Sequence, residues 1–156
     1  MTDEEFIFTG ADDLDFRPAW AEAALDRIER DEVGVCGTND AGNPMVKRGL
    51  HSTHSLVRRS YIDECGGTFD EVPGEVFYTG YDHQSVDNEL IAVAKARDCW
   101  TFAELSLVIH QHPFWNKSVP RDATYDKALL RGREDARLFE RRRREWVRAQ
   151  RRAVRA

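Results

Sequence analysis

The chain has 156 residues, 41% of them hydrophobic and 33% charged, with a formal net charge of −5. This length fits one ordinary domain, and four Trp and eight Phe supply core material, which excludes a disordered protein. No apolar run approaches the length of a membrane span, and Met1–Glu5 is acidic where a secretion signal would be basic. Three widely spaced cysteines favour reduced thiols, so we expect a cytoplasmic protein.

The first element is a short apolar run, Phe6–Phe8, which predicts a buried strand. An acidic turn with Asp12, Asp13 and Asp15 follows, and a helix is expected from Pro18 to Arg30. Adjacent carboxylates repel one another unless a positive group lies between them. That group could be a divalent cation, Mg²⁺ or Mn²⁺, or a nearby arginine. Alternatively, these carboxylates cap the helix and stabilise its positive end.

The middle of the chain alternates between short apolar runs and turn-forming residues. Strands are predicted at Val33–Gly37, Leu50–Arg58, Val76–Tyr78, Trp100–Phe102 and Leu105–Ile109, and helices at Ser60–Cys65 and from Ser85 through Ala94. Strands alternate with helices early in the chain, whereas the later strands lack helical crossovers. The sequence therefore predicts an α/β protein with a mixed β-sheet flanked by helices.

The last part of the chain, residues 121–156, is strongly basic. It carries 13 basic and 6 acidic residues, whereas residues 1–120 carry 10 basic and 22 acidic ones. We expect amphipathic helices here, divided at Gly132, with Glu140 and Arg144 paired one turn apart. Such a block can bind nucleic acid. We favour instead a basic helix lying against the acidic body of its own chain or of a second subunit. We therefore expect the protein to form a homo-oligomer, and we do not expect nucleic acid as a partner.

Two kinds of side chain could carry chemistry later in the chain. His110 and His112 flank one residue at a strand end, so both rings point to the same side and can bind one cation or its phosphates. The alternative is a strand-end cap or a hydrogen-bonded core imidazole. Asp87, in the first turn of a helix, could accept a proton from a substrate hydroxyl. Its alternative role is to stabilise the helix dipole.

A pair of arginines, Arg58 and Arg59, follows a predicted strand. The two guanidinium groups could hold a phosphate in a fork, or could pair with Asp70 or Glu71. We favour the pairing.

The segment Leu56–Glu71, LVRRSYIDECGGTFDE, resembles the "hydrophobic-Arg-Arg … Gly-Gly-Phe-Asp-Glu" segment of family-2 nucleotide-sugar glycosyltransferases of the GT-A fold, with one inserted Thr. The resemblance covers most of residues 1–120. Asp12 and Asp13 resemble the end of that family's metal-binding carboxylate motif, whose first acid falls on Gly10 here. Asp87 stands where the family has its catalytic base.

The resemblance implies further roles for matching positions. His110 or His112 would be a metal ligand, and His83 or His112 would orient the phosphates. Arg58 and Arg59 would bind the donor diphosphate. The implied reaction is inverting, metal-dependent transfer of a sugar from a nucleotide-diphosphate donor to a hydroxyl acceptor.

The implied domain organisation is a GT-A-like half-domain at 1–120, corresponding to the acceptor side, and basic C-terminal helices at 121–156. Only about five residues precede the first predicted strand, so we expect the nucleotide-binding half on a partner chain. The alternative is a non-catalytic remnant of the fold that acts as a binding or oligomerisation module.

Overall fold

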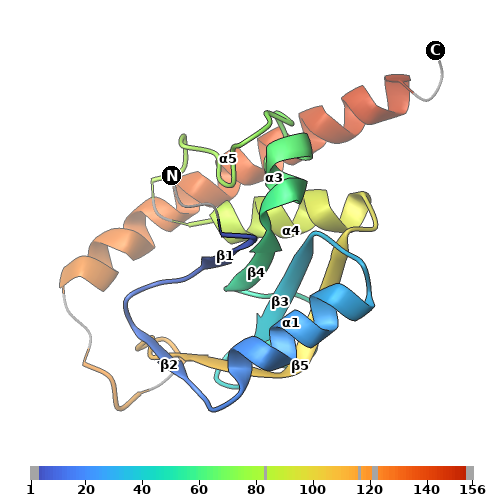
Figure 1. The fold of residues 1–156 in the computed structure, drawn as a ribbon. Coiled ribbons are helices and arrows are strands. Elements are labelled where there is room, and N and C mark those ends of the chain that lie inside the picture. The colour runs from blue at the N-terminus through green and yellow to red at the C-terminus, as the bar shows by residue number, and fades with distance from the viewer. Residues whose placement is uncertain (1–3, 83, 116, 121–122, 154–156) are drawn as a thin grey trace.

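Five strands form one mixed sheet in the order β1-β4-β3-β5-β2 (Figure 1). This arrangement comes from a computed structural model that describes residues 4–82, 84–115, 117–120 and 123–153. The strands are β1 Phe6–Thr9, β2 Leu14–Phe16, β3 Val35–Asn39, β4 Ser55–Arg58 and β5 Trp100–His110. β3 and β5 run parallel, and the other neighbouring pairs are antiparallel. The predicted mixed α/β sheet is confirmed.

Helices lie on both faces of this sheet. They are α1 Trp20–Arg30, α2 Pro44–Lys47, α3 Arg59–Cys65, α4 Val86–Ala96 and α5 Ala123–Ala153. α1 packs against β3 and β5, while α4 packs against β5 and α5. The long α5 crosses the outer side of the α3 and α4 layer (Figure 1).

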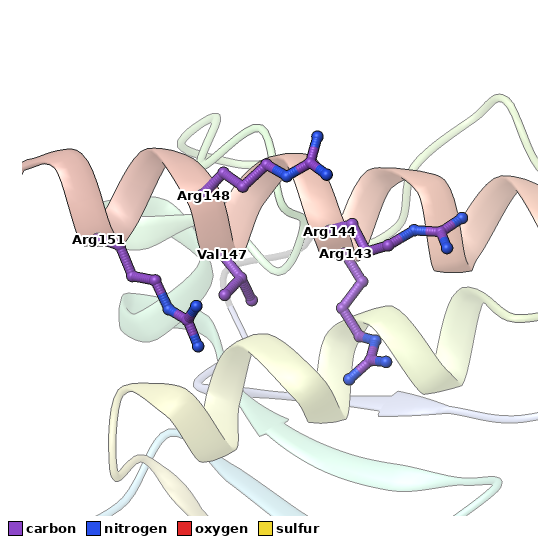
Figure 2. A pocket seen from close by; sticks show the side chains of 5 residues that line it. All are labelled: Arg143, Arg144, Val147, Arg148 and Arg151. Atoms are coloured by element: carbon purple, nitrogen blue, oxygen red, sulfur yellow. The ribbon is translucent and has the colours of Figure 1, made fainter.

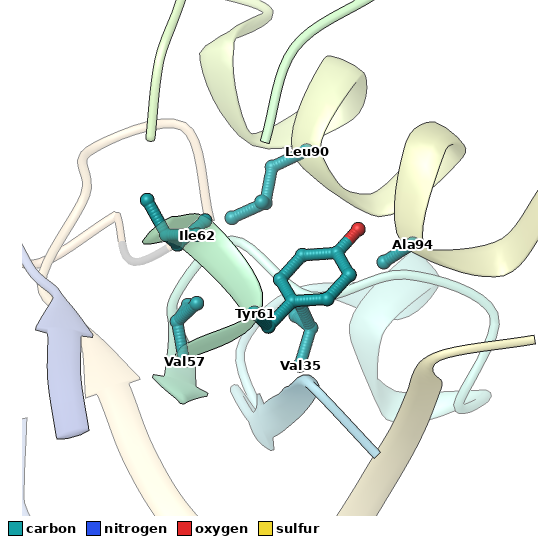
Figure 3. Close-up of a cluster of buried hydrophobic side chains, with 6 residues drawn as sticks. All are labelled: Val35, Val57, Tyr61, Ile62, Leu90 and Ala94. Atoms are coloured by element: carbon teal, nitrogen blue, oxygen red, sulfur yellow. The ribbon is translucent and has the colours of Figure 1, made fainter. Parts of the chain in front are cut away.

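Two hydrophobic clusters lie on opposite faces of the sheet because successive strand residues point to opposite sides. Val35 and Val57 point toward α3 and α4, where they join Tyr61, Ile62, Leu90 and Ala94 (Figure 3). Their chain neighbours Cys36 and Leu56 point the other way and pack with Ala24, Ile28 and Ala103. The middle strands β3 and β4 are therefore buried on both faces.

Four expectations about elements are corrected. The acidic turn is followed by an additional strand, β2, which pairs with the end of β5. Val76–Tyr78 is not a strand. The two strands expected at 100–109 are one strand with an irregularity opposite Thr38 and Asn39. Gly132 does not divide the tail: α5 is continuous, and a Cβ at Gly132 would lie 2.2 Å from the Gln84 side chain.

α5 is attached to the body through one buried ion pair. Arg142 donates to both oxygens of Glu89 at 2.8 and 3.1 Å, and Glu89 is 1% exposed. Glu89 also accepts from the backbone N–H of Phe69 and from the Tyr81 hydroxyl. Burial alone would lower the pKa of Arg142, but hydrogen bonds to Glu89 and Asp70 raise that pKa above its ordinary value. The basic helix therefore lies against acidic groups of its own chain.

Aromatic contacts and further polar contacts extend this attachment along the helix. The ring of Phe69 packs against Phe139 and Trp146, with centroids 5.8 and 5.1 Å apart. The Trp146 indole N–H donates to Glu71. Glu140 pairs with Arg143 at 2.9 Å, not with Arg144 as the sequence predicted.

Among the described residues, no helix is both long enough and apolar enough to cross a bilayer. The three cysteines are free, and burial raises the pKa of the Cys36 thiol to about 12.

We therefore expect Cys36 to stay unmodified by iodoacetamide at pH 8, because the thiolate is the reactive species. Cys65 and Cys99, which are only partly buried, should react first. Mass spectrometry with and without urea checks this, and modification of native Cys36 at the unfolded rate would contradict it.

Candidate functional site

The candidate site lies at one end of the sheet. The parallel strands β3 and β5 have their C-terminal ends at the same end of the sheet. Thr9 at the end of β1 pairs there with Ser55 at the start of β4. Residues that follow β1, β3 and β5, or precede β4, therefore meet there. Asp13 and Asp40 follow β1 and β3, His110 is the last residue of β5, and His54 precedes β4. Carboxyl ends of strands are a frequent position for ligand sites in α/β sheets.

Asp13 and His110 are in direct contact although 97 positions separate them. The Nε2 atom of His110 lies 3.1 Å from both carboxylate oxygens of Asp13. The hydrogen bond is directed to Oδ2, which also accepts from the Tyr125 hydroxyl at 3.3 Å. Because His110 donates through Nε2, its neutral form keeps a lone pair on Nδ1. The predicted acidic turn and strand-end histidine thus meet.

A row of rings continues from this contact. His54, His110, His112 and Tyr125 follow one another with centroids 5.1, 5.1 and 4.9 Å apart. His112 lies just past the end of β5, and its Nδ1 accepts from the backbone N–H of Phe114. The sequence prediction that the two late histidines share one side therefore agrees with the geometry.

His54 is held as a neutral imidazole. Its Nδ1 lies 3.2 Å from the Thr9 carbonyl, which can only accept, so Nδ1 carries the proton. Burial lowers the pKa of His54, and the nearby charge of His110 lowers it further, while Asp87 and Asp40 act in the opposite direction. The lone pair on Nε2 is buried and has no partner among the described residues.

Other buried acceptor atoms in this neighbourhood also lack a hydrogen-bond donor from the described part of the chain. They are Oδ1 of Asp13, Oδ2 of Asp40 and Oδ1 of Asn39. Asp40 is 2% exposed, and its other oxygen accepts from the backbone N–H of Gly42 and of His110. Buried acceptors without donors are costly unless a water or a cation satisfies them. The donor set of oxygen and imidazole nitrogen fits a divalent cation.

Within the described residues, no group of three or more His, Cys, Asp or Glu side chains is arranged closely enough to hold a metal ion. Asp13 and His110 are hydrogen-bonded to each other in this conformation. The site therefore has ligand atoms of the right kind, but they are not arranged around a common point as a metal ion would require.

Asp87 lies in the first turn of α4 and pairs with a histidine that the sequence analysis did not single out. Its Oδ2 is 3.1 Å from Nε2 of His51, and both side chains are about one-fifth exposed, at 21% and 20%. The pair is accessible to solvent, and the charge of Asp87 acts to raise the pKa of His54. The other oxygen of Asp87, Oδ1, accepts a long hydrogen bond of 3.4 Å from the exposed side-chain amide of Asn88. Each carboxylate oxygen has two lone pairs, so Oδ1 keeps one for a proton.

Several predicted site residues lie elsewhere. Arg58 and Arg59 are at the opposite end of β4, where they contact Glu5 and the Glu4 carbonyl. Arg58 pairs with Glu5 and not with Asp70 or Glu71, which corrects the pairing expected for it. A role of the two arginines at the donor diphosphate stays a prediction. Asp12 is exposed beside Asp13.

The remaining predicted residue, His83, lies outside the described residues. Sequence reasoning missed His51 and His54 as members of the site, and it gave Asp40 a possible contact with the acceptor but no role in cation binding. The polar run Thr38–Asp40 and the two histidines before β4 were the available signals.

No family model, curated protein or solved structure matches this chain in the comparisons made.

Proposed function

We propose that this chain is the acceptor-side half of a metal-dependent, inverting glycosyltransferase of the GT-A type. The observation that carries the proposal is the contact between Asp13 and His110, with the unpartnered atoms of His54 and Asp40 beside it. The resemblance of Leu56–Glu71 to family-2 transferases supplies the reaction class. It also implies a nucleotide-binding half, which we assign to another segment or a partner chain.

The cation would be held by Asp13 and His110. The further ligands would be Asp12, the exposed neighbour of Asp13, and His112, whose ring centroid lies 5.1 Å from that of His110. Its chemistry, when bound, is to neutralise charge on the leaving diphosphate. In this proposal the cation replaces the hydrogen bond that now joins Asp13 to His110.

Asp87 acts as the general base. It accepts the proton of the acceptor hydroxyl while that oxygen forms a bond to the anomeric carbon and the bond to the diphosphate breaks. His51 donates a hydrogen bond to Asp87 and orients it. Both groups are partly exposed, so an acceptor from solvent can approach them.

Calorimetry with Mn²⁺, alone and with a panel of nucleotide-diphosphate sugars, tests the proposal. The wild-type chain should bind Mn²⁺, and Asp13→Ala should weaken that binding at least about tenfold, the order expected for loss of one ligand or of a group that orients one. Asp26→Asn is the matched control, because Asp26 is exposed on α1. Equal Mn²⁺ affinity for Asp13→Ala and the control would overturn the metal assignment.

Activity is tested separately, on the chain combined with its nucleotide-binding half. We expect Asp87→Asn to lower kcat by roughly 10²–10⁴-fold with Mn²⁺ affinity unchanged, since the substitution removes only the proton acceptor. Release of nucleoside diphosphate is the readout. An unchanged kcat would remove Asp87 from the mechanism without touching the metal assignment.

One observation favours the alternative of a non-catalytic remnant: the described residues contain no assembled group of three metal ligands. On this alternative Asp13 and His110 form a structural ion pair. Mn²⁺ would then produce no heat, and His110→Ala would destabilise the fold instead.

A further inference from the structure

The inference concerns the outer face of α5, on the side away from the body. Seven exposed arginines lie along it, the first six spaced three or four positions apart: Arg133, Arg137, Arg141, Arg144, Arg148, Arg151 and Arg152. At about 100° per residue they fall within one sector of about 100° around the helix axis. From first to last they span about 28 Å. We call this set the arginine stripe.

The attachment of α5 to the body uses the other side of the helix. Asp135, Arg142 and Trp146 contact the body and lie on the opposite sector. Among the arginines of α5, Arg131 pairs with Asp82, Arg142 with Glu89 and Asp70, and Arg143 with Glu140. The members of the stripe form no ion pair or hydrogen bond with any described residue. The fold thus leaves a row of arginines without ion-pair partners among the described residues, and the exposed Glu134 is an acidic residue at the margin of the same sector.

Figure 2 shows a part of this face near the C-terminal end of α5. Arg144, Arg148 and Arg151, together with Arg143 and Val147, line a surface hollow of about 210 Å³. Figure 2 shows these guanidinium groups spread along the helix and pointing in different directions, so each can donate planar N–H groups to a different phosphate.

We propose that the arginine stripe binds the phosphodiester backbone of a nucleic acid without regard to sequence. A nucleic acid strand carries a phosphate about every 3.4 Å of axis, so a strand can match a straight row of this length. The sector that the stripe occupies carries no aromatic residue for stacking on bases, and the large apolar side chain of Leu130 lies one turn before its first arginine. Recognition would therefore be of phosphates alone.

Two other occupants match this face less well. An anionic membrane favours helices with a free apolar face, but Phe139 and Trp146 of α5 already pack on Phe69. A second copy of the chain offers an acidic row on α1, Glu22, Asp26 and Glu29, which extends over only about 10 Å. That row would leave most of the stripe unpaired.

Fluorescence anisotropy with labelled 20-nucleotide single-stranded and 20-base-pair duplex DNA tests the proposal across a salt series. We expect micromolar affinity at low salt and a steep loss as salt rises. Arg141→Glu/Arg144→Glu/Arg148→Glu should weaken binding by on the order of 100-fold and reduce the slope of log K against log salt by about 2–3. These side chains are exposed and unpaired, so circular dichroism should show the same helicity as the wild type.

The matched control is Arg30→Glu/Lys47→Glu/Arg48→Glu, which makes the same change in net charge at exposed positions outside α5. It should bind DNA within about threefold of the wild type. Equal weakening in both triple variants would overturn the proposal, as would absence of binding at low salt. Stripe-dependent binding to phosphatidylserine vesicles without DNA binding would assign the face to a membrane. A stripe-dependent dimer in sedimentation, again without DNA binding, would assign it to a second copy.

Discussion

Replacing Arg142 with Met is expected to lower the free energy of unfolding by about 3–5 kcal/mol, the cost of leaving one member of a buried ion pair without its partner. Glu89 is 1% exposed, and the Arg142 side chain is 11% exposed. Met fills similar volume, so the loss comes from the charge and its hydrogen bonds. Arg142 also lies over the ring of Tyr78, 3.4 Å from its centroid. Urea unfolding followed by Trp fluorescence measures the change.

Arg144→Met is the control for this experiment. It removes the same group from the same helix at an exposed position that forms no ion pair with any described residue, so its effect should stay within about 0.5 kcal/mol. Equal destabilisation by the two variants would mean that the contact with Glu89 contributes no more than a surface arginine. The attachment of α5 would then have to rest on Phe139 and Trp146.

Gly66→Ala is the second substitution with a large expected effect, about 3–5 kcal/mol of lost stability. Gly66 ends α3 with φ 64° and ψ 160°, a conformation that side-chain-bearing residues rarely adopt. A Cβ there would also lie 2.2 Å from the carbonyl oxygen of Val72, a backbone atom that cannot rotate away. The loop that follows carries Phe69 and Asp70 to α5, so its displacement would disturb that contact too.

Gly74→Ala separates the two causes. Gly74 also has a positive φ, 85°, but nothing lies within 4 Å of an added Cβ. Only conformational strain applies, so we expect a loss of about 1 kcal/mol. Thermal or urea unfolding compares the two variants directly. Similar losses at both positions would show that the loop yields around Val72 and that the contact carries little energy.

The elements with a strong local pattern were predictable. The helix ending at Arg30 and the helix after Ser85 have the apolar spacing that their burial requires. Phe6–Phe8 is a strand as predicted, but a half-buried one at the edge of the sheet and not a buried one. β2 was missed because its three residues follow an acidic turn and owe their strand conformation to pairing with the end of β5. Val76–Tyr78 shows the opposite error, since an apolar run without a neighbouring strand to pair with does not form a ladder.

The site was predictable only in part, for a related reason. Asp13 and His110 carry local signals, a turn of carboxylates and a strand-end histidine, and their contact follows from the sheet order. His54 and Asp40 carry weaker signals, a histidine before a strand and a polar run after one, and their significance lies in acceptor atoms that lack donors among the described residues after folding. Arg58 and Arg59 carried a signal, but β4 directs them to the other end of the sheet. Gly132 did not break α5: it lies where the Gln84 side chain packs closely against the helix, which leaves no room for a Cβ.

The most direct test of the central claim is paramagnetic broadening of histidine imidazole signals by substoichiometric Mn²⁺ in NMR spectra. The account predicts that His54, His110 and His112 broaden first, together with the backbone amides near Asp87, while amides of α1 and the outer face of α5 stay sharp. Broadening confined to the acidic row on α1, or no broadening at all, would contradict a common cation site at the end of the sheet.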